Sequence, residues 1–165
     1  MITKSGGICY LFDFDGTLAG QESFHGYIDC WKEAYKSGVY INPGEYDIRW
    51  SILTGRPKID WPVLKFFCIF QGLFPETILM IDSWRYPYEG NREGKFQWKL
   101  ETLRKVVSNR VPQLCKIRPI MISKVIYIDN DLDTVSYINS NKKIGESIIA
   151  ASVQDFVRGN LEILL

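Results

Sequence analysis

Histidine and cysteine are scarce in this chain, and neither occurs at metal-ligand spacing. The 165 residues include one histidine, His25, and four cysteines, with no CxxC pair and no cysteine–histidine cluster. Cys9 and Cys68 lie in apolar runs, where a free cysteine behaves as a small hydrophobe. We therefore expect reduced, structural cysteines, and we interpret His25 as a residue at the start of a helix.

The chain also lacks a strong charge of either sign and a long hydrophobic run. Its net charge is +1, so no global field draws it toward nucleic acid or membrane, and any such binding needs a local patch. No run approaches the length of a membrane span. The first apolar run is too short for a signal peptide and is interrupted by Asp13. These absences predict a cytoplasmic protein without membrane contact.

Apolar runs that are typical of buried strands alternate with segments of helical periodicity. The expected strands cover residues 8–14, 46–53, 77–82, 124–129 and 147–151. The expected helices cover residues 24–36, 60–72, 95–108, 132–138 and 153–161. This alternation predicts an α/β fold: a single domain over residues 1–165, in which a Rossmann-like three-layer sandwich surrounds a mostly parallel five-stranded sheet. Ligands of such sheets bind beyond the carboxyl ends of the strands, where Asp13, Thr54, Asp82 and Asp129 fall.

Two carboxylates close the first strand in the stretch LFDFDGTL. Asp13 and Asp15 are two positions apart, which places both on the same side of an extended chain. Two close acids repel each other, and one pKa rises unless a cation intervenes. Gly16 permits a tight turn whose N–H groups face an anion. These residues predict a hard divalent cation, an attacking carboxylate and a second carboxyl that transfers protons, with a capping and a turn aspartate as the alternative.

FDFDGTL resembles the first motif of the haloacid dehalogenase superfamily, whose members are mostly phosphatases that act through an aspartyl-phosphate. Three further segments are similar to the other motifs of that family and follow in the same order. They are WSILTGR with Thr54, FQWKLETL with Lys99, and VIYIDNDLD with Asp129. The resemblance spans nearly the whole chain.

The resemblance implies a Mg2+-dependent phosphatase in which Asp13 attacks phosphorus and becomes a transient phosphoaspartate. Asp15 would protonate the leaving oxygen and then deprotonate the attacking water. The carboxylates of Asp13 and Asp129 and the backbone carbonyl of Asp15 would hold Mg2+. Asp131 and Asp133 also follow the strand, and we favour Asp133 as a second acid near the metal, although capping of the next helix explains either residue equally well.

The same resemblance implies that positive charge and backbone donors bind the phosphoryl group. Thr54 and the N–H of Gly55 would bind phosphoryl oxygens, and Lys99 would neutralise charge on the nucleophile and the phosphoryl group. Lys95 is the alternative to Lys99, because it also lies near the start of the expected helix. Arg56 would contact the substrate or pair with a neighbouring acid.

The spacing of the motifs leaves no room for a cap domain, which predicts an open site that admits a large substrate. In residues 83–95, three aromatic side chains interleave with basic ones, a composition suited to stacking bases or to packing on the domain. The chain also resembles, more loosely, the phosphatase modules of polynucleotide kinase-phosphatases. We therefore expect a phosphorylated substrate, a polynucleotide end or a nucleotide, and leave open the oligomeric state and the role of residues 108–123.

Three other classes use similar residues. A signalling receiver places its phosphoacceptor later in the chain, and dehalogenases of the same superfamily generally lack the second aspartate. A catalytically silent phosphate- or partner-binding module usually loses one of the two aspartates, and Asp13 and Asp15 are both present. The silent module remains the alternative to the phosphatase.

Overall fold

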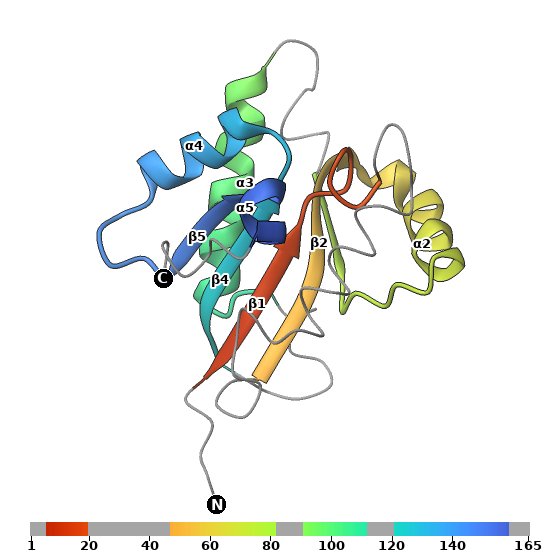
Figure 1. Cartoon of the computed structure of the whole chain (residues 1–165), viewed down its shortest axis with the longest axis horizontal. Helices are drawn as coiled ribbons and strands as arrows, with labels where there is room; N and C mark the ends of the chain where they lie inside the picture. Colours follow the sequence, from red (N-terminus) through yellow and green to blue (C-terminus); the bar gives the residue numbers. More distant parts are fainter. Residues whose placement is uncertain (1–5, 20–46, 82–90, 112–120, 159–165) are drawn as a thin grey trace, which may run out of the picture.

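The strand that precedes Asp13 lies at the centre of a parallel sheet (Figure 1). The computed structural model describes residues 6–19, 47–81, 91–111 and 121–158. In these residues the sheet has five strands in the order β3-β2-β1-β4-β5, and all paired neighbours are parallel. The strands are β1 (Gly7–Phe12), β2 (Asp47–Pro57), β3 (Ile78–Ile81), β4 (Ile122–Asp129) and β5 (Ile148–Ser152).

Continuous apolar runs form the central strands because both faces of the sheet are covered. All six residues of β1 are buried. Its Leu11 pairs with Ser51 of β2 on one side and with Tyr127 of β4 on the other. This register brings the carboxyl ends of the three strands to the same edge of the sheet.

Helices cover both faces of the sheet and complete a three-layer α/β sandwich (Figure 1). They are the 3-10 helix η1 (Lys58–Asp60), α2 (Trp61–Phe70), α3 (Arg92–Val107), α4 (Leu132–Asn141) and α5 (Val153–Arg158). Leu64 of α2 and Phe156 of α5 join the core on the face that carries Phe12. Leu103 of α3 and Ile138 of α4 join the core on the opposite face. The predicted fold class is therefore confirmed, and every described strand pair is parallel.

Several boundaries differ from the predictions, and two of these differences concern β2 and α3. We expected the second strand to end at residue 53, but β2 continues to Pro57, which pairs with Ile81 across a register shift. We expected the third helix to begin at residue 95, but α3 begins at Arg92, because the Asn91 side chain accepts a hydrogen bond from the N–H of Gly94 at 2.9 Å.

Several predictions fall outside the described residues. They concern the helix over 24–36 with His25, Asp82, the aromatic residues of 83–90, most of 108–123, and the end of the last helix. Cys9 and Cys68 are free and buried, as predicted. None of the helices in the described ranges combines the length and apolarity that crossing a bilayer requires.

Candidate active site

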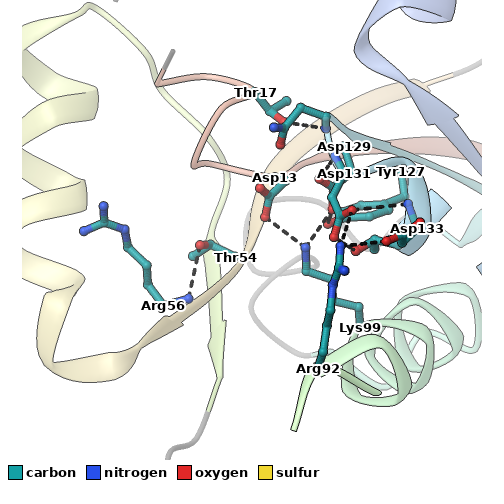
Figure 2. Close-up of polar contacts among 12 residues, drawn as sticks. Asp13, Thr17, Thr54, Arg56, Arg92, Lys99, Tyr127, Asp129, Asp131 and Asp133 are labelled. Carbon is teal, nitrogen blue, oxygen red and sulfur yellow. Dashed lines mark hydrogen bonds and ion pairs between the residues drawn. The ribbon is translucent and has the colours of Figure 1, made fainter. Parts of the chain in front are cut away.

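Two buried carboxylates meet at the carboxyl edge of the sheet (Figure 2). Asp13 follows β1, and its N–H donates to the carbonyl of Ile128 at 2.8 Å, which continues the ladder between β1 and β4. Asp129 is the last residue of β4. The side chains of Asp13 and Asp129 both contact one ammonium group, described next. The strand ends thus bring together the two aspartates that we predicted as metal ligands.

Lys99 of α3 lies between these two carboxylates (Figure 2). Its Nζ donates to Asp13 Oδ1 at 3.1 Å and to Asp129 Oδ2 at 2.7 Å, and the residue is 1% exposed. Leu100 and Leu103 hold this part of α3 against the sheet, which directs Lys99 to its edge. Lys99 makes these contacts, whereas the competing Lys95 lies at a half-buried position on the first turns of the helix.

One ammonium shared by two acids leaves a local excess of negative charge. Burial raises the pKa of Asp13 to about 6, and repulsion from Asp129 adds to this effect while Lys99 opposes it. Burial lowers the pKa of Lys99, but Asp13 and Asp129 outweigh it and hold that pKa above its ordinary value. Lys99 therefore stays charged. Asp13 loses its proton near pH 6, closer to neutral pH than an ordinary aspartate does.

Tyr127 is a third, unpredicted member of this cluster. Its hydroxyl donates to Asp129 Oδ2 at 2.6 Å, and its ring lies 5.3 Å from Lys99 Nζ. Burial and the two nearby carboxylates raise the pKa of Tyr127 well above its ordinary value, so the phenol keeps its proton. Because Tyr127 and Asp129 are two positions apart on β4, both point to the face that α3 covers. Tyr127 therefore holds one oxygen of Asp129 toward Lys99.

Asp15 is exposed, outside the buried cluster, and is held by an arginine. Arg56 Nε lies 3.1 and 2.9 Å from the two carboxylate oxygens of Asp15, and Arg56 Nη2 lies 2.7 Å from Oδ1. The guanidinium also lies 3.7 Å from Asp60 and 5.5 Å from the centre of the Phe14 ring. Of the two roles that we considered for Arg56, the structure shows local pairing.

Thr54 and Gly55 are buried on β2, the strand next to β1. Thr54 Oγ1 accepts a hydrogen bond from the N–H of Arg56 at 3.2 Å (Figure 2). Phe12 pairs with Ile52, so Thr54 and Asp13 lie at the same edge of adjacent strands. The two predicted phosphate-binding residues therefore border the acidic cluster.

The turn after β1 is fixed to the end of β4 through Thr17 and Asn130, to which we had assigned no role, and contains the predicted tight turn at Gly16. Thr17 Oγ1 accepts a hydrogen bond from the N–H of Asn130 at 3.0 Å. Gly16 has φ +77°, and a Cβ there would overlap the side-chain amide of Asn130. Gly16 and Thr17 belong to the DxDGT pattern, which is the signal that could have identified Thr17.

Asp131 and Asp133 lie at the start of α4 and pair with an arginine from α3. Asp131 caps the helix by accepting from the N–H of Asp133 and from Thr134 Oγ1, at 3.2 and 2.8 Å. Arg92 Nη2 lies 3.0 Å from Asp131 Oδ1 and 2.8 Å from Asp133 Oδ2. Capping thus describes Asp131, and Asp133 forms an exposed ion pair with Arg92. The role of Asp133 near a metal stays a prediction.

The predicted metal ligands, two carboxylates and one backbone carbonyl, are oxygen donors of the type that a small hard cation prefers. When its amide nitrogen faces the site, Asn130 donates to the Asp15 backbone carbonyl at 2.9 Å and to Asp129 Oδ1 at 3.3 Å. A positively polarised group therefore bridges two of the three predicted ligands, and the third, Asp13, carries the excess charge described above. Among the described residues no three acidic, histidine or cysteine side chains converge. The predicted set of two carboxylates and one carbonyl does not require such a cluster.

Comparison with known proteins gives a likeness of fold. No protein-family model and no curated protein sequence matches the chain. A chain of the Pnkp1/Rnl/Hen1 RNA repair complex is similar in structure, with a TM-score of 0.50 and 14% identity over 92% of this chain and 44% of that one. A chain from a second structure of the Pnkp1/Rnl/Hen1 complex has a TM-score of 0.47, 14% identity, and coverage of 91% and 47%. The protein thus spans less than half the length of these solved chains, and the first likeness shows a shared α/β fold.

Proposed function

We propose that this protein is a Mg2+-dependent phosphatase of the haloacid dehalogenase type that hydrolyses a phosphomonoester on a polynucleotide end or a nucleotide. The observation that carries the proposal is the buried Asp13–Lys99–Asp129 cluster, with Asp15 two residues after Asp13 and paired with Arg56. A charged lysine between two buried acids is costly as a structural device, because replacing such pairs by apolar residues is often neutral or stabilising. A catalytic role would explain why these charges are buried despite that free-energy cost.

Each residue has a role that its position supports. Asp13 would attack phosphorus in line, and the bond to the leaving oxygen would break as Asp15 delivers a proton to that oxygen. Asp15 would then take a proton from the water that attacks phosphorus and releases Asp13 with inorganic phosphate. Arg56 would orient the Asp15 carboxylate, and Lys99 would neutralise charge that moves from Asp13 to the phosphoryl group.

The remaining residues complete the phosphate site. Thr54 and the N–H of Gly55 border Asp13 and would donate to phosphoryl oxygens. The Asp13 and Asp129 carboxylates and the Asp15 carbonyl would hold Mg2+. When bound, the cation would neutralise charge on the phosphate as it approaches the nucleophile. A dianionic phosphate cannot approach a buried carboxylate without such compensation.

The proposed substrate class rests on two further points. The structural likeness is to a chain of an RNA repair complex, and we extend polynucleotide repair to this chain as a proposal. The predicted open site would admit a polynucleotide end. A phosphatase acting on such an end would serve a repair reaction by leaving a hydroxyl group.

The test measures inorganic phosphate release with and without Mg2+. Substrates are 3′- and 5′-phosphorylated oligonucleotides, a mononucleotide, a phosphopeptide and an aryl phosphate. Asp13→Asn is compared with Asp155→Asn, which changes an acid that hydrogen-bonds Ser152 at the start of α5. We expect Mg2+-dependent turnover in the wild type and in Asp155→Asn, and none in Asp13→Asn. A folded wild type without turnover on any substrate contradicts the proposal and favours a silent binding module.

A further inference from the structure

Helix α2 carries a second apolar face that points away from the sheet. Leu64 and Cys68 are the buried residues of this helix, and they pack in the core. Six large apolar side chains on or next to the helix are instead between 58% and 83% exposed. We call this set the α2 outer face: Ile59, Val63, Phe66, Ile69, Phe70 and Phe74.

The six side chains of the α2 outer face are uncharged, although the oppositely charged Lys58 and Asp60 flank Ile59. Val63, Phe66 and Phe70 recur at three- and four-residue spacing, which aligns them on one side of a helix. The rings of Phe66 and Phe70 stack with centroids 6.4 Å apart. A helix that is apolar on all sides is normally covered on all sides. In Figure 1, α2 lies at the side of the molecule away from β4 and β5.

The chemistry of this face excludes a charged partner. Lys65 is the one charged residue within Trp61–Phe70, and its ammonium lies 4.6 Å from the Trp61 ring centre. Nucleic acid or an anionic membrane would require a cluster of basic side chains around the aromatic ones, and α2 does not supply it. The occupant is therefore an apolar protein surface.

The size and symmetry of the α2 outer face fit a second copy of this chain. At about 150–250 Å² for an aromatic side chain, covering the three phenylalanines removes roughly 340–560 Å² per copy, and the three aliphatic side chains add to this area. A stable interface of standard size buries about 800 Å² per partner. An uncharged helix face can pair with itself around a two-fold axis without placing like charges together. We infer that two copies of this protein associate through their α2 outer faces, independently of the proposed catalytic function.

Analytical ultracentrifugation of the full chain tests this inference, with concentrations up to about 100 µM so that a Kd in the micromolar range is covered. Phe66→Glu/Phe70→Glu places two charges on the α2 outer face. Ile144→Glu is the matched control, because Ile144 is fully exposed in the turn between α4 and β5. We expect a dimer for the wild type and the control, and a monomer for the double variant. Circular dichroism should show equal helix content in all three.

A second variant distinguishes loss of the dimer interface from misfolding of the double variant. Ile69→Lys carries its charge on the same face but leaves both phenylalanines in place, and it should also be monomeric. A wild type that stays monomeric at the highest concentration overturns the inference, and it would mean that another segment of the chain or a different protein covers the face. A dimer that persists in both α2 variants, or that is lost in Ile144→Glu, overturns it as well.

Discussion

Asp13 places a buried negative charge in the folded protein. Asp13→Asn should remove the free-energy cost of burying that charge. The carboxyl group is 6% exposed, and burial raises its pKa from 3.8 to about 6 despite the nearby Lys99. Asparagine has nearly the same shape, and its carbonyl oxygen can still accept the hydrogen bond from Lys99. The variant therefore isolates the charge of Asp13 from its packing.

The sign of the effect follows from where the proton binds. Between pH 3.8 and about 6, the folded protein holds a proton on Asp13 that the unfolded chain has already released. The contribution of Asp13 to the free energy of unfolding is thus fully present below pH 3.8 and is lost as pH rises through about 6. The pKa rises by roughly two units, so at about 1.4 kcal/mol per unit the loss is about 3 kcal/mol.

Urea unfolding between pH 4 and pH 8, followed by tryptophan fluorescence with a chelator present, measures this effect. Comparing the two proteins cancels the titration of the other carboxylates. Part of the loss has already occurred at pH 4, so we expect the difference in unfolding free energy to shift in favour of Asp13→Asn by about 2.5 kcal/mol between pH 4 and pH 7. Parallel curves for the wild type and the variant would refute the assignment of a buried, weakly acidic Asp13.

Three further substitutions test the cluster by the same unfolding assay. Lys99→Met leaves two buried carboxylates without their cation, so it should lower the free energy of unfolding by about 3–5 kcal/mol at pH 7 and by less at pH 4. Equal losses at both pH values would contradict the ion-pair role. Tyr127→Phe keeps the ring beside Lys99 but removes a donor to Asp129, and should cost about 1.5–3 kcal/mol, against a smaller loss for Tyr10→Phe on the opposite face. Gly16→Ala should cost at least about 1 kcal/mol, because φ is +77° and the new Cβ would overlap Asn130; an unchanged stability would show that the turn can relax.

Most of the fold follows from local pattern, because buried parallel strands read as continuous apolar runs. Where the prediction failed, a hydrogen-bond partner that the local pattern does not reveal decided the outcome. Thr54-Gly55-Arg56-Pro57 contains two turn residues, yet β2 continues through it because β3 supplies a partner across a register shift. The start of α3 was missed because glycine disfavours helix interiors, whereas Gly94 here supplies the N–H that Asn91 caps.

The sequence indicated which residues gather at the candidate site, but it did not indicate all of the ion pairs among them. Strand ends identified Asp13, Thr54 and Asp129, and their meeting follows from the parallel topology. The resemblance implied Lys99 beside Asp13, but it did not show that Lys99 also contacts Asp129 or that Asp15 is the acid that Arg56 holds. These choices depend on side-chain reach across elements that the sequence alone does not position.

The central position of β1 has a consequence for how the chain is made. The turn after β1 and the end of β4, which hydrogen-bond through Thr17 and Asn130, are 113 positions apart. At about 5–20 residues per second, ribosomes leave roughly 6–23 s between the synthesis of these two segments. During that interval β1 has at most one of its two neighbours, and an apolar strand edge is available to chaperones or to other nascent chains. β1 is thus synthesised before β2 and β4, and its second edge stays unpaired until β4 is made. The chain would therefore depend on folding assistance more than its size suggests.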